Sequence, residues 1–349
     1  MSMPALVRLR EALPSTHIAL LTDQKLAELW RDYPGLDEII PFTKAHGVGH
    51  VSRVLRNGQY DAALVLPNSF RSAFETWLAA IPMRVGYGRK MLLTHRVPPR
   101  AEHIEMHKRT AAEVKRLITQ SPSRPRETYP ISAHHLHQYL RLASFFGASE
   151  EPLRPSLSLR EQELTAFAEK FQIDCSRPVF GLNPGAEYGP AKRWPARNFA
   201  DTAIQLSATE KVHWLIFGGA ADAATSAAIA SLIRQRGGAV QDLAGRTTLR
   251  ELAVGLSLCN AVLTNDTGPM HLAAAVGTPV VVPFGSTSPE LTGPGIPGDT
   301  RHRPILGNVP CAPCFLRVCP IDLRCMNSIP ANQVHAALLE FLHESPARR

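Results

Sequence analysis

Apolar runs and amphipathic stretches alternate along most of this chain. In the second half, short apolar runs typical of buried strands recur with a helical stretch between each pair. The expected strands are 179–182, 212–217, 239–243, 261–263 and 280–282. This alternation predicts an α/β domain in which helices cover a parallel sheet.

The first half shows the same alternation less clearly. It begins with an amphipathic helix, although doubly wound folds commonly open on a strand. The expected strands are 18–22, a run ending at 39–40, 62–66 and 84–86, and the expected helices are 4–13, 69–80, 104–118 and 133–146. Two α/β domains with a cleft between them form the simplest architecture that fits both halves.

Segments rich in proline and turn residues indicate the domain boundaries. A proline-rich segment at 152–155, a helix at 161–171 and a turn at 176–178 fit a connection between domains. We therefore expect an N-terminal domain at 1–155, a connection at 156–176, a C-terminal domain at 177–330, and a closing helix and tail at 331–349.

The stretch 261–290 has the order strand, turn, helix, strand, with its first turn at 265–268. Open α/β sheets bind ligands at such strand ends, and free N–H groups at a helix N-terminus favour a phosphate. Asp266 and His271 would flank a bound anion, unless Asp266 is only a helix cap and His271 only a satisfied turn residue. A second polar turn at 284–289 makes a nucleotide-sized crevice the better interpretation.

Two adjacent cations, Lys192 and Arg193, lie in the long loop after the strand at 179–182. At the carboxyl end of a strand they would neutralise a diphosphate leaving group. The alternative is a solvated cationic pair.

A double glycine and a carboxylate follow the strand at 212–217. Gly219 would let the backbone approach a ligand, and Asp222 would bind ribose hydroxyls unless it is a helix cap. The chain contains no G-x-x-x-x-G-K-[ST], and G-x-G-x-x-G occurs only at 293–298, which does not directly follow an expected strand, so a P-loop enzyme and a Rossmann dehydrogenase both lose their main support.

In the first half, an amide, a hydroxyl and a guanidinium follow the strand at 62–66. Asn68, Ser69 and Arg71 would suit a polyhydroxylated or anionic substrate. The alternative is that Ser69 caps the next helix and Arg71 is solvated.

Four of the six cysteines, Cys311, Cys314, Cys319 and Cys325, have the spacing C-x2-C-x4-C-x5-C. The first pair has the spacing of a structural zinc site, but the second does not match a zinc ribbon, and buried reduced thiols are the alternative. The formal charge of +8 suits an anionic partner. No motif of a nucleic-acid reader, membrane span or signal peptide is present, so we expect no nucleic-acid partner and a cytoplasmic protein.

Two motifs carry a resemblance to a known family. Residues 184–195 read PGAEYGPAKRWP, and residues 264–271 read TNDTGPMH. Together they resemble the bacterial ADP-heptose:lipopolysaccharide heptosyltransferases of glycosyltransferase family nine. The run NSFRS at 68–72 and the cysteine-rich tail are most similar to the heptosyltransferase II branch.

The resemblance implies a fold and a site. The fold would be α/β of the GT-B type, with two Rossmann-like domains facing across a cleft. By matching motif positions, the ADP-heptose donor site would comprise Gly185, Glu187, Lys192, Arg193, Gly219, Asp222, Asp266, Thr267, Gly268 and His271, and the acceptor site Asn68, Ser69 and Arg71. Lys192 and Asp266 would also take part in catalysis.

The resemblance also implies inverting transfer without a cofactor or an active-site metal. Family members begin with a strand and a Gly-Asp loop whose Asp resembles the general base, whereas this sequence begins at Met-Ser-Met-Pro-Ala-Leu. We therefore expect the base upstream of Met1, and a first-domain sheet that lacks its central strand and has exposed edges.

The function implied is heptose transfer to the heptosyl-Kdo2-lipid A inner core of lipopolysaccharide, at the cytoplasmic face of the inner membrane. The basic charge suits an anionic acceptor and peripheral contact with an anionic membrane surface. The alternatives are another heptosyltransferase of the family, type I or III, and a noncatalytic nucleotide-sugar binder.

Overall fold

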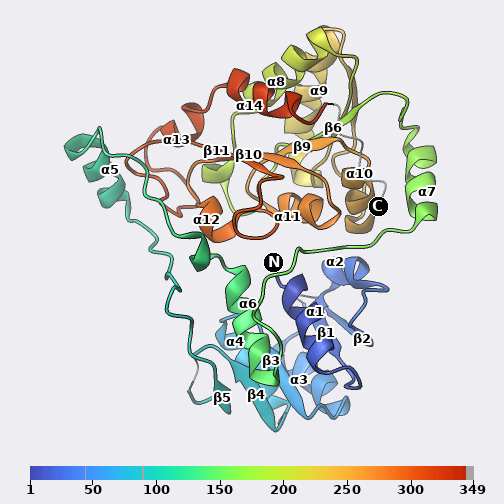
Figure 1. Ribbon diagram of the computed structural model, residues 1–349, viewed down its shortest axis with the longest axis vertical. Helices are drawn as coiled ribbons and strands as arrows, with labels where there is room; N and C mark the ends of the chain where they lie inside the picture. Colours follow the sequence, from blue (N-terminus) through green and yellow to red (C-terminus); the bar gives the residue numbers. More distant parts are fainter. Residues whose placement is uncertain (44, 89, 343–349) are drawn as a thin grey trace. The chain divides into compact units, whose positions relative to one another are not determined.

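The structure is a computed structural model that describes residues 1–43, 45–88 and 90–342 (Figure 1). The chain divides into two compact units: Met1–Ile104 with Ser132–Pro155, and Glu105–Ile131 with the chain from Ser156 onward. Residues 105–131 therefore belong to the second unit, which differs from the N-terminal domain expected at 1–155. The connection expected at 156–176 and the closing helix also lie in the second unit, and the tail at 343–349 lies outside the described residues.

The second unit contains a six-stranded parallel sheet in the order β11-β10-β9-β6-β7-β8. Its strands are β6 (Val179–Asn183), β7 (His213–Ile216), β8 (Ala239–Asp242), β9 (Ala261–Thr264), β10 (Val280–Phe284) and β11 (Arg303–Leu306). The five strands expected from the apolar runs are confirmed. The sequence missed β11, because it is a short edge strand with two exposed residues rather than an apolar run.

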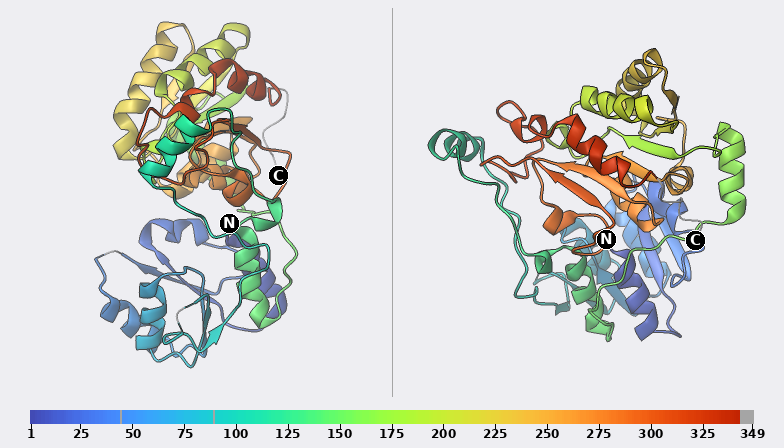
Figure 2. Two further views of the ribbon diagram at one scale, coloured as in Figure 1. Left: turned by 90° about the vertical axis from the view of Figure 1, so that its left-hand side faces the viewer. Right: turned by 45° about the horizontal axis from the view of Figure 1, so that its top comes forward.

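Helices cover both faces of this sheet. The helices of this unit are α5 (Ala111–Gln120), α7 (Glu161–Phe171), α8 (Ala196–Thr209), α9 (Ala223–Gln235), α10 (Leu249–Ser257), α11 (Gly268–Ala275), α12 (Pro289–Thr292), α13 (Arg324–Asn327) and α14 (Ala331–Leu339). Figures 1 and 2 show α8, α9 and α14 on one face, and α7, α10 and α11 on the other. The helix expected at 104–118 begins only at 111, because Thr110 and Glu113 form a capping box there.

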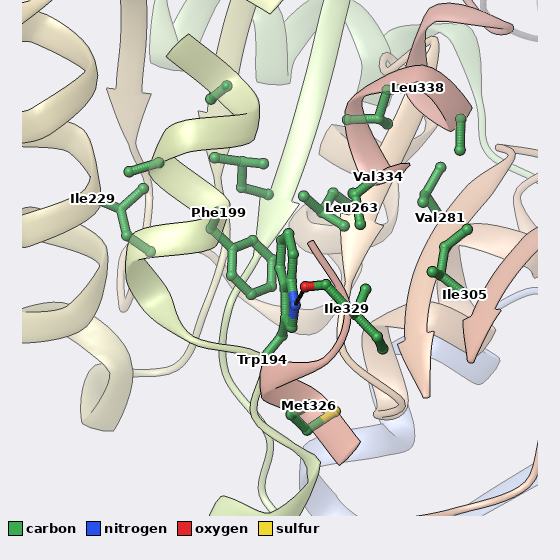
Figure 3. Close-up of a cluster of buried hydrophobic side chains, with 14 of the residues drawn as sticks. Trp194, Phe199, Ile229, Leu263, Val281, Ile305, Met326, Ile329, Val334 and Leu338 are labelled. Carbon is green, nitrogen blue, oxygen red and sulfur yellow. Dashed lines mark hydrogen bonds between the residues drawn. The ribbon is translucent and has the colours of Figure 1, made fainter. Parts of the chain in front are cut away.

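One large hydrophobic cluster forms the core between the sheet and the first of these helix layers (Figure 3). Phe199 from α8 and Leu338 from α14 pack there beside Leu263 from β9. Trp194 belongs to the same cluster, and its Nε1 donates to the Ile329 carbonyl at 3.1 Å. The loop that precedes α8 is therefore anchored in the core.

The first unit contains two separate parallel sheets among the described residues, β1-β2 and β3-β4-β5. Its strands are β1 (Ala19–Asp23), β2 (Glu38–Phe42), β3 (Ala62–Val65), β4 (Met83–Gly86) and β5 (His95–Arg96), and its helices are α1 (Met3–Ala12), α2 (Gln24–Ala27), α3 (Val48–Asn57), α4 (Phe70–Leu78) and α6 (Leu136–Ala143). In the described part of the chain, β1 pairs with β2 alone and β3 with β4 alone.

Alternate side chains of β3 point to opposite faces of its sheet. Val65 packs with Ala73 of α4, whereas Leu64 packs with Leu142 of α6. Helices α4 and α6 therefore cover opposite faces. Over residues 1–43, 45–88 and 90–342, no helix is both long and apolar enough to span a bilayer.

Candidate functional site

Four neighbouring strands of the second unit end in the polar turns that the sequence singled out. The strand order reverses between β6 and β9, since β7 and β8 lie on one side of β6 and β10 and β11 lie beyond β9. Such a switch point is the usual ligand site of an open parallel sheet. The turns after β10, β9, β6 and β7 therefore lie along one edge, as expected for the crevice.

A buried network joins three of these turns. Lys192 Nζ, from the loop after β6, lies 2.7 Å from Asp266 Oδ2, in the turn after β9. The Thr287 hydroxyl, in the turn after β10, donates to the same Oδ2 at 2.6 Å. The side chains of Lys192 and Asp266 are 15% and 5% exposed, so both charges are largely removed from water. Each charge therefore depends on the opposite charge to offset the cost of its burial.

The Asn265 side chain joins the turn after β9 to the loop after β6. Its Oδ1 accepts from the Trp194 backbone N–H at 2.9 Å, and its Nδ2 donates to the Pro184 carbonyl at 2.7 Å. Both ends of the loop that carries Lys192 are therefore held against the turn after β9. The sequence included Asn265 only as a turn residue, because its amide contacts join positions more than 70 residues apart.

The N-terminus of α11 opens beside this network. Thr267 is its N-cap in an extended conformation, Gly268 is exposed, and His271 lies half-buried in the first turn. The first N–H groups of an α-helix have no intrahelical acceptor, and the helix dipole favours an anion there. Because Lys192 neutralises Asp266, the Asp266 carboxylate does not oppose the approach of a phosphate.

Asp222, in the turn after β7, lies close to three other residues of the predicted ADP-heptose site. Its carboxylate accepts from the Gly219 N–H at 3.1 Å and lies 3.7 Å from an Arg193 nitrogen. A Cβ on Gly185 would lie 2.4 Å from the same carboxylate, so a larger residue at that position would require Asp222 to shift. The contact with Gly219 closes the short 3-10 helix Ala220–Asp222, whereas the Asp222 side chain makes no capping hydrogen bond to α9, and a ribose contact stays a prediction.

Glu187 and Tyr188, the two residues before Gly189, have different surroundings. Glu187 is exposed. The ring of Tyr188 has the Lys192 ammonium and the Arg317 guanidinium each 5.0 Å from its centroid. Its hydroxyl donates to the Phe315 carbonyl at 2.9 Å, which ties the loop after β6 to the cysteine-rich segment.

Arg126 was not singled out by the sequence, yet it holds the turn after β10. It is 6% exposed, and its guanidinium donates to the carbonyls of Phe284 at 3.1 Å, Gly285 at 3.3 Å and Thr287. Burial lowers the pKa of Arg126, which measures the cost of desolvating its charge. The proline-rich sequence around it gives no signal of this contact, because the partners lie about 160 residues away.

In the first unit, the predicted acceptor residues make mostly local contacts. Ser69 caps α4 by accepting from the Ser72 N–H at 3.1 Å, and Asn68 is exposed. Arg71 is paired with Glu75 at 2.7 Å and donates to the His46 carbonyl at 2.9 Å, so it is not simply solvated. The capping role of Ser69 is confirmed, and the acceptor role of all three stays a prediction.

The four clustered cysteines line one small cavity of the second unit, together with Ser286. Burial raises the pKa of Cys311 to about 11 and that of Cys325 to about 12, which keeps both thiols protonated near neutral pH. Across the described residues, no three His, Cys, Asp or Glu side chains are placed to hold a metal ion. The zinc alternative stays a prediction.

Comparisons with known proteins point to one family. Residues 48–324 match the family described as glycosyltransferase family 9 (heptosyltransferase). The chain is 31% identical over 300 residues to lipopolysaccharide heptosyltransferase 2 of Salmonella typhimurium, covering 82% of this chain and 79% of that protein. It is 34% identical over 275 residues to lipopolysaccharide heptosyltransferase 2 of Escherichia coli, covering 75% and 72%.

The fold is also shared with solved structures. The chain resembles the structure of E. coli ADP-heptose lps heptosyltransferase II with a TM-score of 0.75 and 27% identity, covering 98% of this chain and 94% of that one. A family 9 glycosyl transferase from Veillonella parvula, at 21% identity, matches in fold with a TM-score of 0.76 over 99% and 93%. The family match spans most of the chain and includes both motifs at the strand ends, and the chain therefore belongs to glycosyltransferase family 9, the heptosyltransferases.

Proposed function

We propose that this chain transfers heptose from ADP-heptose to the heptosyl-Kdo2-lipid A inner core of lipopolysaccharide. The observation that carries the proposal is the buried contact among Lys192, Asp266 and Thr287 at the N-terminus of α11. It brings a cation, hydroxyls and helix N–H groups to the sheet edge where a diphosphate would bind. The relatives named heptosyltransferase 2 support this choice of donor and acceptor.

The site suits the leaving-group side of an inverting transfer. In that reaction the bond between the heptose anomeric carbon and the β-phosphate oxygen breaks, and ADP leaves with the electron pair. The acceptor oxygen bonds to the same carbon from the opposite face, and its proton passes to a base. Lys192, the N–H groups of α11 and the nearby Arg193 would stabilise the charge that develops on ADP.

The acceptor and the location complete the proposal. Asn68, Ser69 and Arg71 would contact the anionic inner core, and the protein would work at the cytoplasmic face of the inner membrane. The positive formal charge of the chain supports an anionic acceptor and an anionic lipid surface.

The test is ADP release by the full chain with ADP-heptose and heptosyl-Kdo2-lipid A, run beside calorimetric titration with ADP alone. Release that needs this acceptor, and that Lys192→Met reduces about 100-fold, supports the proposal. Release with Kdo2-lipid A instead would assign the chain to heptosyltransferase I. Tight ADP binding without release under either condition would favour a noncatalytic nucleotide-sugar binder.

A further inference from the structure

Helices α3 and α4 of the first unit lie side by side and run in the same direction. Three hydrogen bonds to backbone carbonyls join α3, with the turn before it, to α4, from their N-terminal ends to their C-terminal ends. They run from Arg71 to His46 at 2.9 Å, from Ser52 to Glu75 at 3.0 Å, and from Arg56 to Leu78. The two helices therefore present one continuous outer face, called here the α3–α4 face (Figure 1).

A row of aromatic rings lies along the outer side of α4. Phe70 and Phe74 stack with their centroids 5.5 Å apart, and Phe74 and Trp77 stack at 5.5 Å. The spacing i, i+4, i+7 places the three rings on one side of the helix. Phe70 is 59% exposed and Trp77 45% exposed, whereas Ala73 is buried beneath them. The row is thus a large apolar surface in contact with water.

Helices α3 and α4 carry exposed cations but no exposed carboxylate. Helix α3 contributes Arg53 and Arg56, both exposed, and its sequence contains no Asp or Glu. On α4 the sole acidic residue is Glu75, which is 4% exposed and paired with Arg71. The α3–α4 face therefore combines exposed aromatic rings with a positive charge that no exposed carboxylate on either helix offsets.

We propose that the α3–α4 face is a membrane-docking surface for an anionic bilayer. Phe70, Phe74 and Trp77 enter the interfacial region, where aromatic side chains are favoured, and Arg53 and Arg56 contact lipid phosphates. The inference rests on the proposed function only for its setting, since an enzyme with a lipid-anchored acceptor works at a lipid surface.

The charge of the face argues for lipid rather than for a second copy of the chain. Two copies joined through this face would bring the same arginines together without exposed carboxylates on α3 or α4 to pair with them. Anionic headgroups supply the missing negative charge over the whole face at once.

The test is sedimentation of the full chain with vesicles of phosphatidylglycerol and phosphatidylcholine in equal amounts, and with vesicles of phosphatidylcholine alone. The double variant Phe70→Ser/Trp77→Ser is expected to weaken binding to the anionic vesicles about tenfold, because it removes two of the three rings that enter the interfacial region. Arg53→Gln is expected to weaken it about fivefold, and added salt is expected to reduce that difference.

Phe145→Ser is the matched control. Phe145 is 40% exposed and lies on the short helix that follows α6, on the other face of the β3-β4-β5 sheet. It is expected to leave vesicle binding within about twofold of the wild type. Circular dichroism and ADP titration of every variant confirm that the fold and the donor site are intact.

Three outcomes would overturn the inference. They are equal binding by the wild type and the double variant, equal loss with Phe145→Ser, and a concentration-dependent dimer that Phe70→Ser/Trp77→Ser abolishes without any effect on vesicle binding. Vesicle binding is measured without donor or acceptor, so it can fail while heptose transfer succeeds. Conversely, transfer can fail while the vesicle result stands.

Discussion

An ion pair with a buried carboxylate lies among the site residues of each unit, but the two pairs are built differently. In the first unit, Arg71 and Glu75 are one turn apart on α4, and the Arg71 side chain is 43% exposed. In the second unit, Lys192 and Asp266 come from loops 74 residues apart, and both are largely buried. The first pair requires only a helix, whereas the second requires the assembled sheet.

The same contrast extends to the cores beneath the two sites. The second unit has a six-stranded sheet and a large hydrophobic cluster on one face of it, into which the Lys192 loop is anchored through Trp194. The described part of the first unit has two separate sheets, with smaller clusters beside them. The proposed donor residues therefore lie on a preorganised framework, and the proposed acceptor residues have mainly local support.

Among the variants that test this comparison, Lys192→Met is expected to have the largest effect. It leaves the Asp266 carboxylate buried without its cation, which is expected to cost about 3 kcal/mol of unfolding free energy in the second unit. Hydrogen exchange of peptides from β6 and β9 under increasing urea measures this loss.

Arg197→Met is the control, because it removes an exposed pair with Asp201 in the same unit. It is expected to cost less than about 1 kcal/mol. The double variant Lys192→Met/Asp266→Asn should recover part of the loss. Equal losses for the two single variants would show that the buried network contributes no more than a surface pair.

Arg126→Gln tests whether the turn after β10 needs its buried guanidinium. The loss of hydrogen bonds to the carbonyls of Phe284, Gly285 and Thr287 should release the Thr287 hydroxyl from Asp266. ADP affinity, measured by calorimetry, is expected to fall about tenfold, as for loss of one charge-assisted hydrogen bond.

Arg124→Gln is the matched control, since Arg124 lies two residues away and is exposed. It should leave ADP affinity unchanged. If Arg126→Gln binds ADP as the wild type does, the turn after β10 holds its shape without the guanidinium, and the donor half is less dependent on residues 105–131 than the structure indicates.

Sequence patterns predicted the parts of this molecule that are local. Apolar runs located β6, β9 and β10, and the polar turns at their ends were correctly brought together, because parallel strands share one carboxyl edge. Ser69 was correctly weighed as a helix cap, since capping depends on three neighbouring residues.

The missed features depend on contacts between distant segments. Arg126 holds carbonyls about 160 residues away, and the segment that carries it belongs to the second unit despite its place in the first half of the chain. The edge strand β11 has no apolar run of its own. No local pattern encodes such pairings, because they arise only when the sheet is complete.

In the first unit, Ser69→Ala separates a structural role from a binding role. Loss of the cap on α4 is expected to cost about 1 kcal/mol of unfolding free energy. Exchange protection of α4 peptides should fall accordingly, while ADP affinity and the KM for the acceptor stay unchanged. A raised acceptor KM with unchanged protection of α4 would instead mean that the Ser69 hydroxyl contacts the acceptor. That result would make the two halves of the molecule more alike.

The smallest expected effect is the pH dependence of the link between α7 and α10. Glu163 accepts from Arg250 through both carboxylate oxygens, at 2.8 and 2.9 Å. Chiefly through this contact, the pKa of Glu163 is lowered from 4.5 to about 2. A lowered pKa stabilises the fold fully above the unfolded value and loses that effect as the pH falls through the folded value.

Glu163→Gln should therefore lower the melting temperature by about 2 °C above pH 5, with the gap to the wild type closing between about pH 4.5 and pH 2. Melting curves across this range measure the gap. Glu38→Gln in the first unit is the control, because Glu38 is exposed and its contacts are with His17 and Tyr60. If Glu38→Gln lowers the melting temperature as much as Glu163→Gln does, half-burial does not strengthen the Glu163–Arg250 pair. The contrast between the two units would then be confined to the proposed donor site.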